Sequence, residues 1–505
     1  MQTKNIFSLI IAALVLTGTG CKKILDQEIN GSYTPENFFT SDVNAQLAVN
    51  AAYSSLSFSS GANNAIWVLG DVASDDAIKG GNPGDQADFD AINNFNILPT
   101  NSAVEAVWKQ YYNGVFQANV VLDGLAGNTL VSAAAQKADI AQAKFLRAYY
   151  YFILTNCYGN IPLHLHVDAG AAAQIAPSLQ DSVYAQIERD CLAAIPDLPL
   201  PSAVSATNFG IVTQGAAYAL LAKCYLFHTS LANNYQLAVT AAQQVETFGY
   251  SLTARYYDNF SASTKMNTEE ILSVNQIAGT QGLGNELNAW FAPRTINGYG
   301  FFYPTQSLID NYETATGGQV DPRLDYTVAR AGHSYFDLPY DTTWSTTGYI
   351  TKKMVQPLSE VPSSIKNVGT VNYEALRLGD ILLVEAEALN ESNQSAAALI
   401  PLNKVRKRAR ESYLNDTSLP GYGTVPAGLL ADISTTDQTQ LRAIIQRERR
   451  SELALEFHRF FDVIRYGSAY ATAALTPGAP GFSYANNKWF PIPQSERDAN
   501  PNWNK

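Results

Sequence analysis

The chain has 505 residues and a formal net charge of −12, from 45 Asp and Glu against 33 Lys and Arg. This balance argues against nucleic acid as a partner, because phosphate binding needs clustered positive charge. Charged residues make up only 15% of the chain, while Tyr and Phe number 28 and 22. Much of the surface must therefore be neutral and polar, which suits hydroxyl-rich ligands.

The N-terminus has the pattern of a secretory signal peptide that ends at a cysteine. Lys4 precedes an apolar run over 6–16, and small residues stand directly before Cys21. The apolar run is too short to cross a bilayer core of about 30 Å. We therefore predict a lipoprotein signal peptide over residues 1–20 and lipidation of Cys21. An ordinary secreted protein with an incidental cysteine is the alternative.

Apolar residues recurring at three- and four-residue steps predict a mostly α-helical fold. Two helix pairs, 213–228 with 235–248 and 373–390 with 396–410, carry small residues that allow close packing and resemble tetratricopeptide units. The segment 270–277 alternates like a strand. The other predicted helices are 105–125, 135–158, 181–194 and a long one over 439–466.

Two long connecting segments, 57–102 and 251–372, join these helices. They are rich in Gly, Asn, Asp, Ser, Thr and aromatic residues. Connections of this length are usually either functional or disordered, and their aromatic content argues against disorder. We therefore expect the ligand-binding loops in these two segments.

The sequence carries none of the enzyme motifs HExxH, GxSxG, P-loop or GxGxxG. His164 and His166 form an HxH pair without a third ligand nearby, so we predict a structural role for them rather than metal binding. Cys157, Cys191 and Cys224 match no zinc or redox spacing, and their apolar contexts predict small buried residues.

Acidic residues are the remaining candidates for chemistry. Glu448, Glu452 and Glu456 recur every four residues among arginines. A glycosidase uses paired carboxylates, but we favour a partly buried ion-pair lattice that ties this helix to the rest of the fold. The segment 70–90 holds six aspartates without EF-hand spacing. We predict a ligand-binding polar loop there and no cofactor, with a structural Ca²⁺ ion as the alternative.

Aromatic clusters in 289–303 and at Trp344 favour a carbohydrate site. Sugars place their C–H faces on aromatic rings while their hydroxyls meet amides and carboxylates. Asn, Gln and Arg stand beside these rings in the sequence. The alternative is hydrophobic packing beneath a long loop.

Sequence blocks in a fixed order resemble the SusD/RagB family of nutrient-binding outer-membrane lipoproteins. The resemblance covers essentially the whole mature chain, and the blocks are specific only in combination. After Cys21 they are 33–39, 108–123, 143–152, 158–163, 382–389, 402–409, 448–465 and 489–501.

The resemblance implies a mostly α fold of four tetratricopeptide-like helix pairs that support a loop-rich, partly β ligand-binding region. It divides the chain into a helical region over 21–250 and a region with binding loops and further helix pairs over 251–505. The loops around 75–89 and 290–344 correspond to the family's binding region. The predicted ligand-binding residues are Asp75, Asp76, Lys79, Asn82, Phe89, Trp290, Arg294, Asn297, Tyr299, Tyr303 and Trp344.

The resemblance also implies a function and partners. We expect a non-catalytic lipoprotein of the outer membrane, facing the cell exterior, that captures an oligosaccharide for a SusC-like TonB-dependent transporter. Lys22 and Lys23 follow the cysteine where acidic surface-export signals are common, which weakens the case for an outward orientation. A tetratricopeptide-type adaptor that binds polypeptides is the alternative, and a glycoside hydrolase is the third hypothesis.

Overall fold

The structure is a computed structural model that describes residues 38–59, 64–168, 170–277, 283–296, 298–361 and 369–504. The predicted signal peptide, the predicted lipidation site Cys21 and the predicted ligand-binding residue Asn297 lie outside the described residues. Within the described part, no helix combines the length and apolar composition needed to cross a membrane.

Helices dominate the described residues, which confirms the predicted mostly α fold. Apart from α4, which was not predicted, the long helices begin and end within a few residues of the predicted positions over most of the chain. They are α4 (Asp42–Tyr53), α6 (Ser102–Leu125), α7 (Ala133–Tyr158), α8 (Gln180–Ala194), α9 (Gln214–Phe227), α10 (Asn234–Glu246), α14 (Leu378–Glu391), α15 (Ser395–Asn415) and α16 (Gln438–Glu452).

Side-chain caps fix where several of these helices begin. The side chains of Asn101, Ser132 and Thr213 accept hydrogen bonds from backbone N–H groups in the first turns of α6, α7 and α9. The helix α7 ends at Gly159, whose φ of 73° is readily adopted only without a Cβ atom. These local signals explain why the helix boundaries could be predicted.

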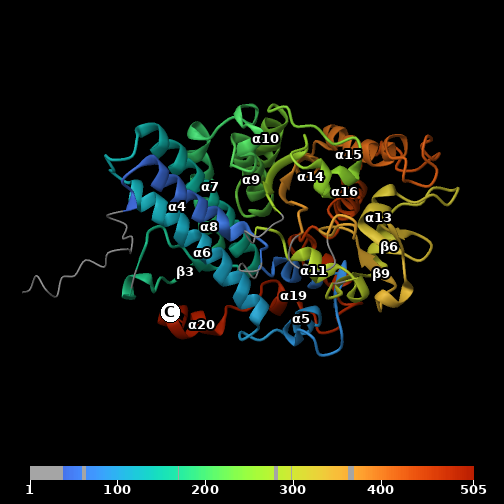
Figure 1. Ribbon diagram of the computed structural model, residues 1–505, viewed down its shortest axis with the longest axis horizontal. Coiled ribbons are helices and arrows are strands. Elements are labelled where there is room, and N and C mark those ends of the chain that lie inside the picture. The colour runs from blue at the N-terminus through green and yellow to red at the C-terminus, as the bar shows by residue number, and fades with distance from the viewer. Residues whose placement is uncertain are drawn as a thin grey trace, which may run out of the picture.

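The helices pack as successive pairs along one side of the molecule (Figure 1). The helix α6 packs against α7, α9 against α10 and α14 against α15, and α10 in turn contacts α14. In Figure 1 the series runs from α4 and α6 at the left through α9 and α10 to α14 and α15 at the upper right. The two tetratricopeptide-like pairs predicted from the sequence are both present and lie next to each other.

Short elements make up the loop-rich part, where each strand pairs with one antiparallel partner. The strand pairs are β1 (Ala77–Gly80) with β5 (Phe301–Pro304), β2 (Ile161–Pro162) with β3 (Pro177–Ser178), β4 (Glu270–Val274) with β10 (Tyr373–Arg377), β6 (Val328–Arg330) with β9 (Tyr349–Thr351), and β7 (Ser334–Tyr335) with β8 (Leu338–Pro339). The short helices are α5 (Ala87–Asn93), α11 (Leu287–Phe291), α12 (Gln306–Asn311), α13 (Pro322–Thr327), α17 (Arg459–Arg465), α18 (Ser468–Leu475), α19 (Tyr484–Asn487) and α20 (Gln494–Ala499).

One strand replaces the start of a predicted helix. The predicted helix over 373–390 begins only at Leu378, because residues 373–377 form β10 and pair with the predicted strand β4. All five residues of β10 are buried. A strand buried on both faces shows no alternation of polar and apolar residues, so its periodicity could not separate it from the helix that follows.

The long helix predicted over 439–466 is wrong in its middle. The helix α16 ends at Glu452, and α17 begins only at Arg459. In between, the carboxylate of Asp71 accepts the backbone N–H groups of Phe457 (2.8 Å) and Arg459 (3.1 Å). A Cβ atom on Gly70 would lie 2.3 Å from the carbonyl oxygen of Phe457, so a glycine is required at this approach. The break arises from contacts nearly 390 residues apart in sequence, which local periodicity cannot reveal.

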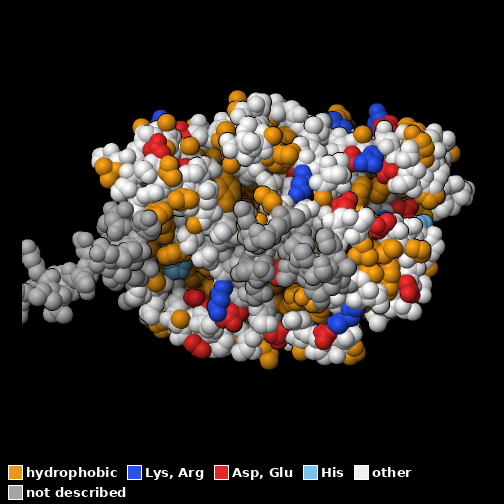
Figure 2. All heavy atoms as spheres, in the orientation of Figure 1, with side chains coloured by type: hydrophobic (Ala, Val, Ile, Leu, Met, Phe, Trp, Pro, Cys, Tyr) orange, Lys and Arg blue, Asp and Glu red, His pale blue; other side chains and the backbone are white. Residues whose placement is uncertain are grey.

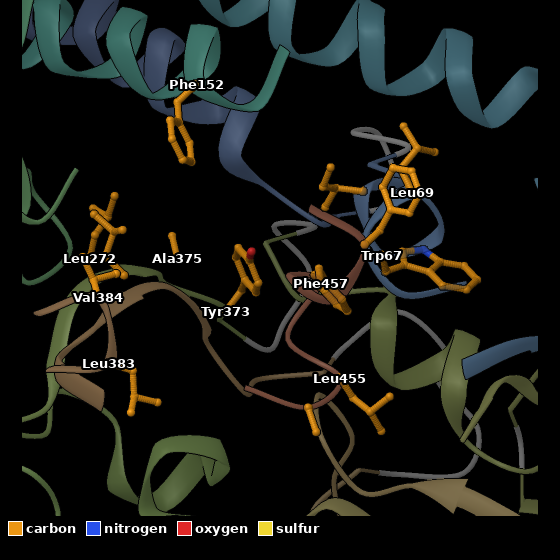
Figure 3. Packing of buried hydrophobic residues seen from close by; sticks show 14 of the residues in the cluster. Trp67, Leu69, Phe152, Leu272, Tyr373, Ala375, Leu383, Val384, Leu455 and Phe457 are labelled. Atoms are coloured by element: carbon orange, nitrogen blue, oxygen red, sulfur yellow. The ribbon is translucent and has the colours of Figure 1, made fainter. Parts of the chain in front are cut away.

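A hydrophobic core joins the helical and loop-rich parts (Figure 3). The rings of Tyr373 and Phe457 stack with centroids 5.4 Å apart and planes 18° from parallel. The same cluster of buried residues runs from Ala52 to Ile492. Buried apolar contacts therefore continue across residue 250, and the division of the chain at that residue stays a prediction.

The predicted ion-pair lattice is confirmed and lies deeper than expected. Arg377 contacts Glu452 and Glu456 at 2.7 Å and Glu269 at 2.9 Å, and these four side chains are at most 1% exposed. Burial alone would raise the pKa of Glu456, but Arg377 and Lys353 outweigh burial and hold that pKa below its usual range. These carboxylates therefore serve as ionised partners of buried cations within the fold.

Candidate functional site

An open depression of about 420 Å³ lies where α11 meets the start of α5. It combines aromatic rings with carboxylate, amide and guanidinium groups. Three of the predicted ligand-binding residues, Trp290, Arg294 and Tyr299, line it. The full lining is Asp85, Gln86, Glu286, Trp290, Arg294, Tyr299 and Phe301.

A cluster of buried aromatic rings packs against the indole of Trp290. The Trp290 ring lies 5.1 Å from Phe301, 6.0 Å from Phe89 and 5.9 Å from Trp67, measured between ring centroids. Phe89, Phe301 and Trp67 are buried, whereas Trp290 is only partly buried. Packing on three sides therefore fixes the indole while part of it borders the depression.

A tight turn of the backbone between residues 292 and 299 places Tyr299 beside Trp290. The backbone N–H of Tyr299 donates to the carbonyl of Ala289 at 2.7 Å. A Cβ atom on Gly298 would overlap the Ala292 backbone, so this return requires a glycine. The two aromatic rings meet at 5.5 Å with planes 61° apart. The result is a rigid, angled aromatic corner of the kind on which a sugar ring can stack.

Paired charges form the polar wall of the depression. Arg294 forms an ion pair with Asp85, and Asp85 also accepts the backbone N–H of Asn82 at 3.1 Å. Glu286 lies one helical turn before Trp290, and burial raises the pKa of its carboxyl group. The exposed Gln86 stands directly before α5 with a left-handed φ of 47°. The wall thus offers hydrogen-bond donors and acceptors, and Arg294, the one cation among its described residues, is neutralised by Asp85.

The other predicted aromatic residues do not line this depression. Phe89 is buried beneath it, and Tyr303 is buried with its hydroxyl donating to the carbonyl of Trp344 at 2.9 Å. The Trp344 ring packs against Tyr335 at 5.6 Å and Tyr340 at 5.7 Å. Hydrophobic packing beneath a long loop, the alternative weighed from the sequence, therefore describes Trp344 better than a place in this depression.

The predicted charged residues of the acidic segment also lie elsewhere. Asp75 pairs with Arg459 at 2.7 Å, Asp76 pairs with Arg450 at 2.7 Å, and Lys79 pairs with Asp90 at 2.7 Å. Both Asp–Arg pairs are more than nine-tenths buried, whereas Lys79 is buried and its partner Asp90 is 47% exposed. The sequence could not show the Asp–Arg pairs, because both arginines come from a helix region 374 to 384 residues away. Asn82 stays exposed in the loop that leads to Asp85.

Four lining residues, Asp85, Gln86, Glu286 and Phe301, were absent from the predicted set. Asp85 belongs to the acidic segment 70–90 noted in the sequence. Glu286 had a readable signal, since it precedes Trp290 by four residues and therefore shares its helix face. Phe301 belongs to the aromatic cluster noted in the sequence. Gln86 had no signal, because only the tertiary approach of α5 to α11 brings it to the site.

The described residues contain no group of three His, Cys, Asp or Glu side chains suited to hold a metal ion. His166 pairs with Asp123 at 2.8 Å, and the ring of His164 packs against Tyr112. The three described cysteines, Cys157, Cys191 and Cys224, are free and buried, as predicted. Binding of a structural Ca²⁺ stays untested.

The chain matches two family models. The SusD family model matches residues 268–505, and a model described as "Starch-binding associating with outer membrane" matches residues 24–226. SusD-like protein P2 of Formosa agariphila is 27% identical over 98% of this chain and 98% of its own length. A SusD-like protein of Bacteroides ovatus is 23% identical over 95% of this chain and 85% of its own length.

Solved structures share the fold along nearly the whole chain. A laminarin binding SusD-like protein superposes with a TM-score of 0.74 at 28% identity, covering 91% of this chain and 98% of its own. Surface glycan-binding protein A from Bacteroides thetaiotaomicron, in complex with laminarihexaose, superposes with a TM-score of 0.73 at 25% identity and the same coverage. With family models matching both halves and relatives aligned nearly end to end, this chain belongs to the SusD/RagB family.

Proposed function

We propose that this protein binds a neutral oligosaccharide in the depression lined by Trp290 and Tyr299. One observation carries the proposal: a partly exposed indole and a phenol ring meet at a fixed angle beside amide, carboxylate and guanidinium groups. Sugar rings stack on such surfaces through their C–H faces, and their hydroxyls bond to the polar wall.

The charge distribution supports a neutral ligand. Arg294 is already paired with Asp85, so the depression offers no free cation for an acidic sugar. The chain as a whole carries a net charge of −12, which disfavours polyanions further. In the face shown in Figure 2, charged side chains are sparse among neutral polar and apolar atoms.

A laminarin-type glucan is the ligand class that we propose. The support comes from two relatives that span more than 90% of this chain, one described as laminarin binding and one in complex with laminarihexaose. Their identities of 28% and 25% leave room for change in the binding loops. The structure of this chain adds an aromatic corner that fits glucan stacking.

The cellular setting is part of the same proposal. The family description "associating with outer membrane" supports a place at that membrane. We propose anchoring through Cys21, display on the cell exterior and delivery of the glycan to a SusC-like TonB-dependent transporter. Protease treatment of intact cells tests display, the Cys21→Ser variant tests anchoring, and co-purification with an outer-membrane barrel protein tests the partner.

Calorimetric titration with hexasaccharides tests the ligand class. We expect laminarihexaose to bind and maltohexaose and cellohexaose to bind at least about tenfold more weakly. The same incubations are assayed for reducing ends, because Asp85 and Glu286 both line the depression and a hydrolase would also use two carboxylates. We expect no release of reducing ends. Absence of binding to every glycan in the panel would refute the proposed function.

A further inference from the structure

A second depression, of about 440 Å³, lies at the other end of α5. Its walls come from β1, from the segment after α5, from α18 and from the loop that follows α18. Its residues include the predicted ligand-binding residue Asp75, which does not reach the first depression. The lining includes Asp75, Ile78, Asn93, Arg459, Tyr470 and Ala473.

The second depression repeats the chemical groups of the first. Tyr470 provides a partly exposed ring, and its hydroxyl accepts a hydrogen bond from Arg459 at 3.3 Å. The carboxylate of Asp75 is held by Arg459 at 2.7 Å and Arg450 at 3.0 Å. Both guanidinium groups are more than nine-tenths buried, so the carboxylate is fixed in orientation. Asn93 supplies the amide, as Gln86 does in the first depression.

Two structural elements run from one depression to the other. Gln86, which lines the first depression, directly precedes α5, and Asn93, which lines the second, is the last residue of α5. Seven helical residues span about 10 Å. Side by side with α5, β1 leads from Ile78 in the second depression to Gly80, the partner of Phe301 in the first. The two depressions are therefore neighbours on a rigid support.

The strand register places the lining residues on one face of the β1–β5 pair. Ile78 lies opposite Tyr303, and Gly80 lies opposite Phe301. Residues two apart on a strand point to the same face, as do directly opposed residues on paired strands. Ile78 and Phe301 therefore project from the same face of this ribbon, toward the second and the first depression.

We infer that one glycan chain occupies both depressions, with the ring of Tyr470 and the carboxylate of Asp75 forming a distal subsite. This inference rests on the proposed function. It adds that the distal subsite makes long glycan chains bind more tightly than short ones. A disaccharide fits within the first depression alone. A hexasaccharide reaches across α5 and gains contacts with the fixed carboxylate and the second ring.

Titration of laminaribiose and laminarihexaose into the full-length protein and its variants tests the inference. We expect the unmodified protein to bind the hexasaccharide at least about tenfold more tightly than the disaccharide. Tyr470→Ala should weaken hexasaccharide binding about 3- to 10-fold and leave disaccharide binding unchanged. Ala473→Arg, at an exposed helical position that tolerates a long side chain, fills the same depression without removing a packed ring.

The outcomes separate this inference from the proposed function. If both variants bind the hexasaccharide as the unmodified protein does, while Trp290→Ala weakens both ligands, the distal subsite is refuted and the proposed function stands. Equal affinity of the unmodified protein for the two ligands refutes it as well. If neither ligand binds, the proposed function fails and the distal subsite falls with it.

Discussion

Removal of one cation from the buried ion-pair lattice should destabilise the protein strongly. Arg377 donates to Glu452 and Glu456 at 2.7 Å and to Glu269 at 2.9 Å, and water reaches none of these groups. The Arg377→Met variant keeps much of the side-chain volume but removes the cation that contacts all three carboxylates, and leaves Arg408 for Glu269 and Glu452 and Lys353 for Glu456. Loss of one partner from a buried ion pair costs about 3–5 kcal/mol, so we expect a loss of that size.

An exposed ion pair provides the matched control. Lys109 lies 2.7 Å from Glu105 on the surface of α6, and its side chain is 67% exposed. The Lys109→Met variant removes the same kind of contact where water screens it, and should cost no more than about 0.5 kcal/mol. Urea-induced unfolding, followed by tryptophan fluorescence, gives both free energies.

A second substitution tests the reason for the loss. Glu456→Gln in the Arg377→Met background removes a charge that has lost its main partner, so it should recover part of the stability. Arginine and lysine neighbours hold the pKa values of Glu269, Glu452 and Glu456 below their usual range, so the contribution of these three carboxylates is present at neutral pH and is lost as pH falls below about 4. If Arg377→Met costs no more than Lys109→Met, the reasoning is refuted.

Two further predictions concern stability and the limits of the site. Burial, together with the nearby charge of Asp42, raises the pKa of Asp139 to about 6. The protonated Asp139 carboxyl group therefore contributes its full stability below about pH 4, and this contribution is lost as pH rises through 6. Asp139→Asn should raise the free energy of unfolding at pH 7 by about 1–2 kcal/mol in urea unfolding. No gain in stability would contradict burial of the charged carboxylate as the cause of the raised pKa. Trp344→Ala should lower the melting temperature, because the ring packs against Tyr335 and Tyr340. It should change the glycan affinity measured by calorimetry less than about twofold, because Trp344 does not line the depression. A tenfold loss of affinity would place Trp344 in the site.

Local signals in the sequence predicted most of the helices. Capping residues such as Ser132 and Thr213 and a terminal glycine such as Gly159 act within one helical turn, so the sequence contains them in full. The break after Glu452 depends instead on Gly70 and Asp71 docking from the far end of the chain. No local pattern near residue 452 encodes that contact.

The sequence predicted the aromatic residues of the candidate site better than its polar residues. Trp290 and Tyr299 are only nine residues apart in sequence, so the sequence alone indicated an aromatic cluster that contains both. The sequence predicts Asp75 and Asp76 as ligand-binding residues but not their ion pairs, because their partners Arg459 and Arg450 follow 374 to 384 residues later. The polar wall of the depression is assembled by tertiary contacts such as Arg294 with Asp85, more than 200 residues apart.

Two aromatic residues on the surface test whether the glycan binds at the Trp290 corner. Trp290 lines the depression, whereas Phe116 on α6 is 45% exposed and lies in neither depression. Titration of laminarihexaose should show at least about a tenfold loss of affinity for Trp290→Ala and no change for Phe116→Ala. Unchanged affinity in the Trp290→Ala protein, with its fold intact, would contradict the claim that this aromatic corner holds the glycan.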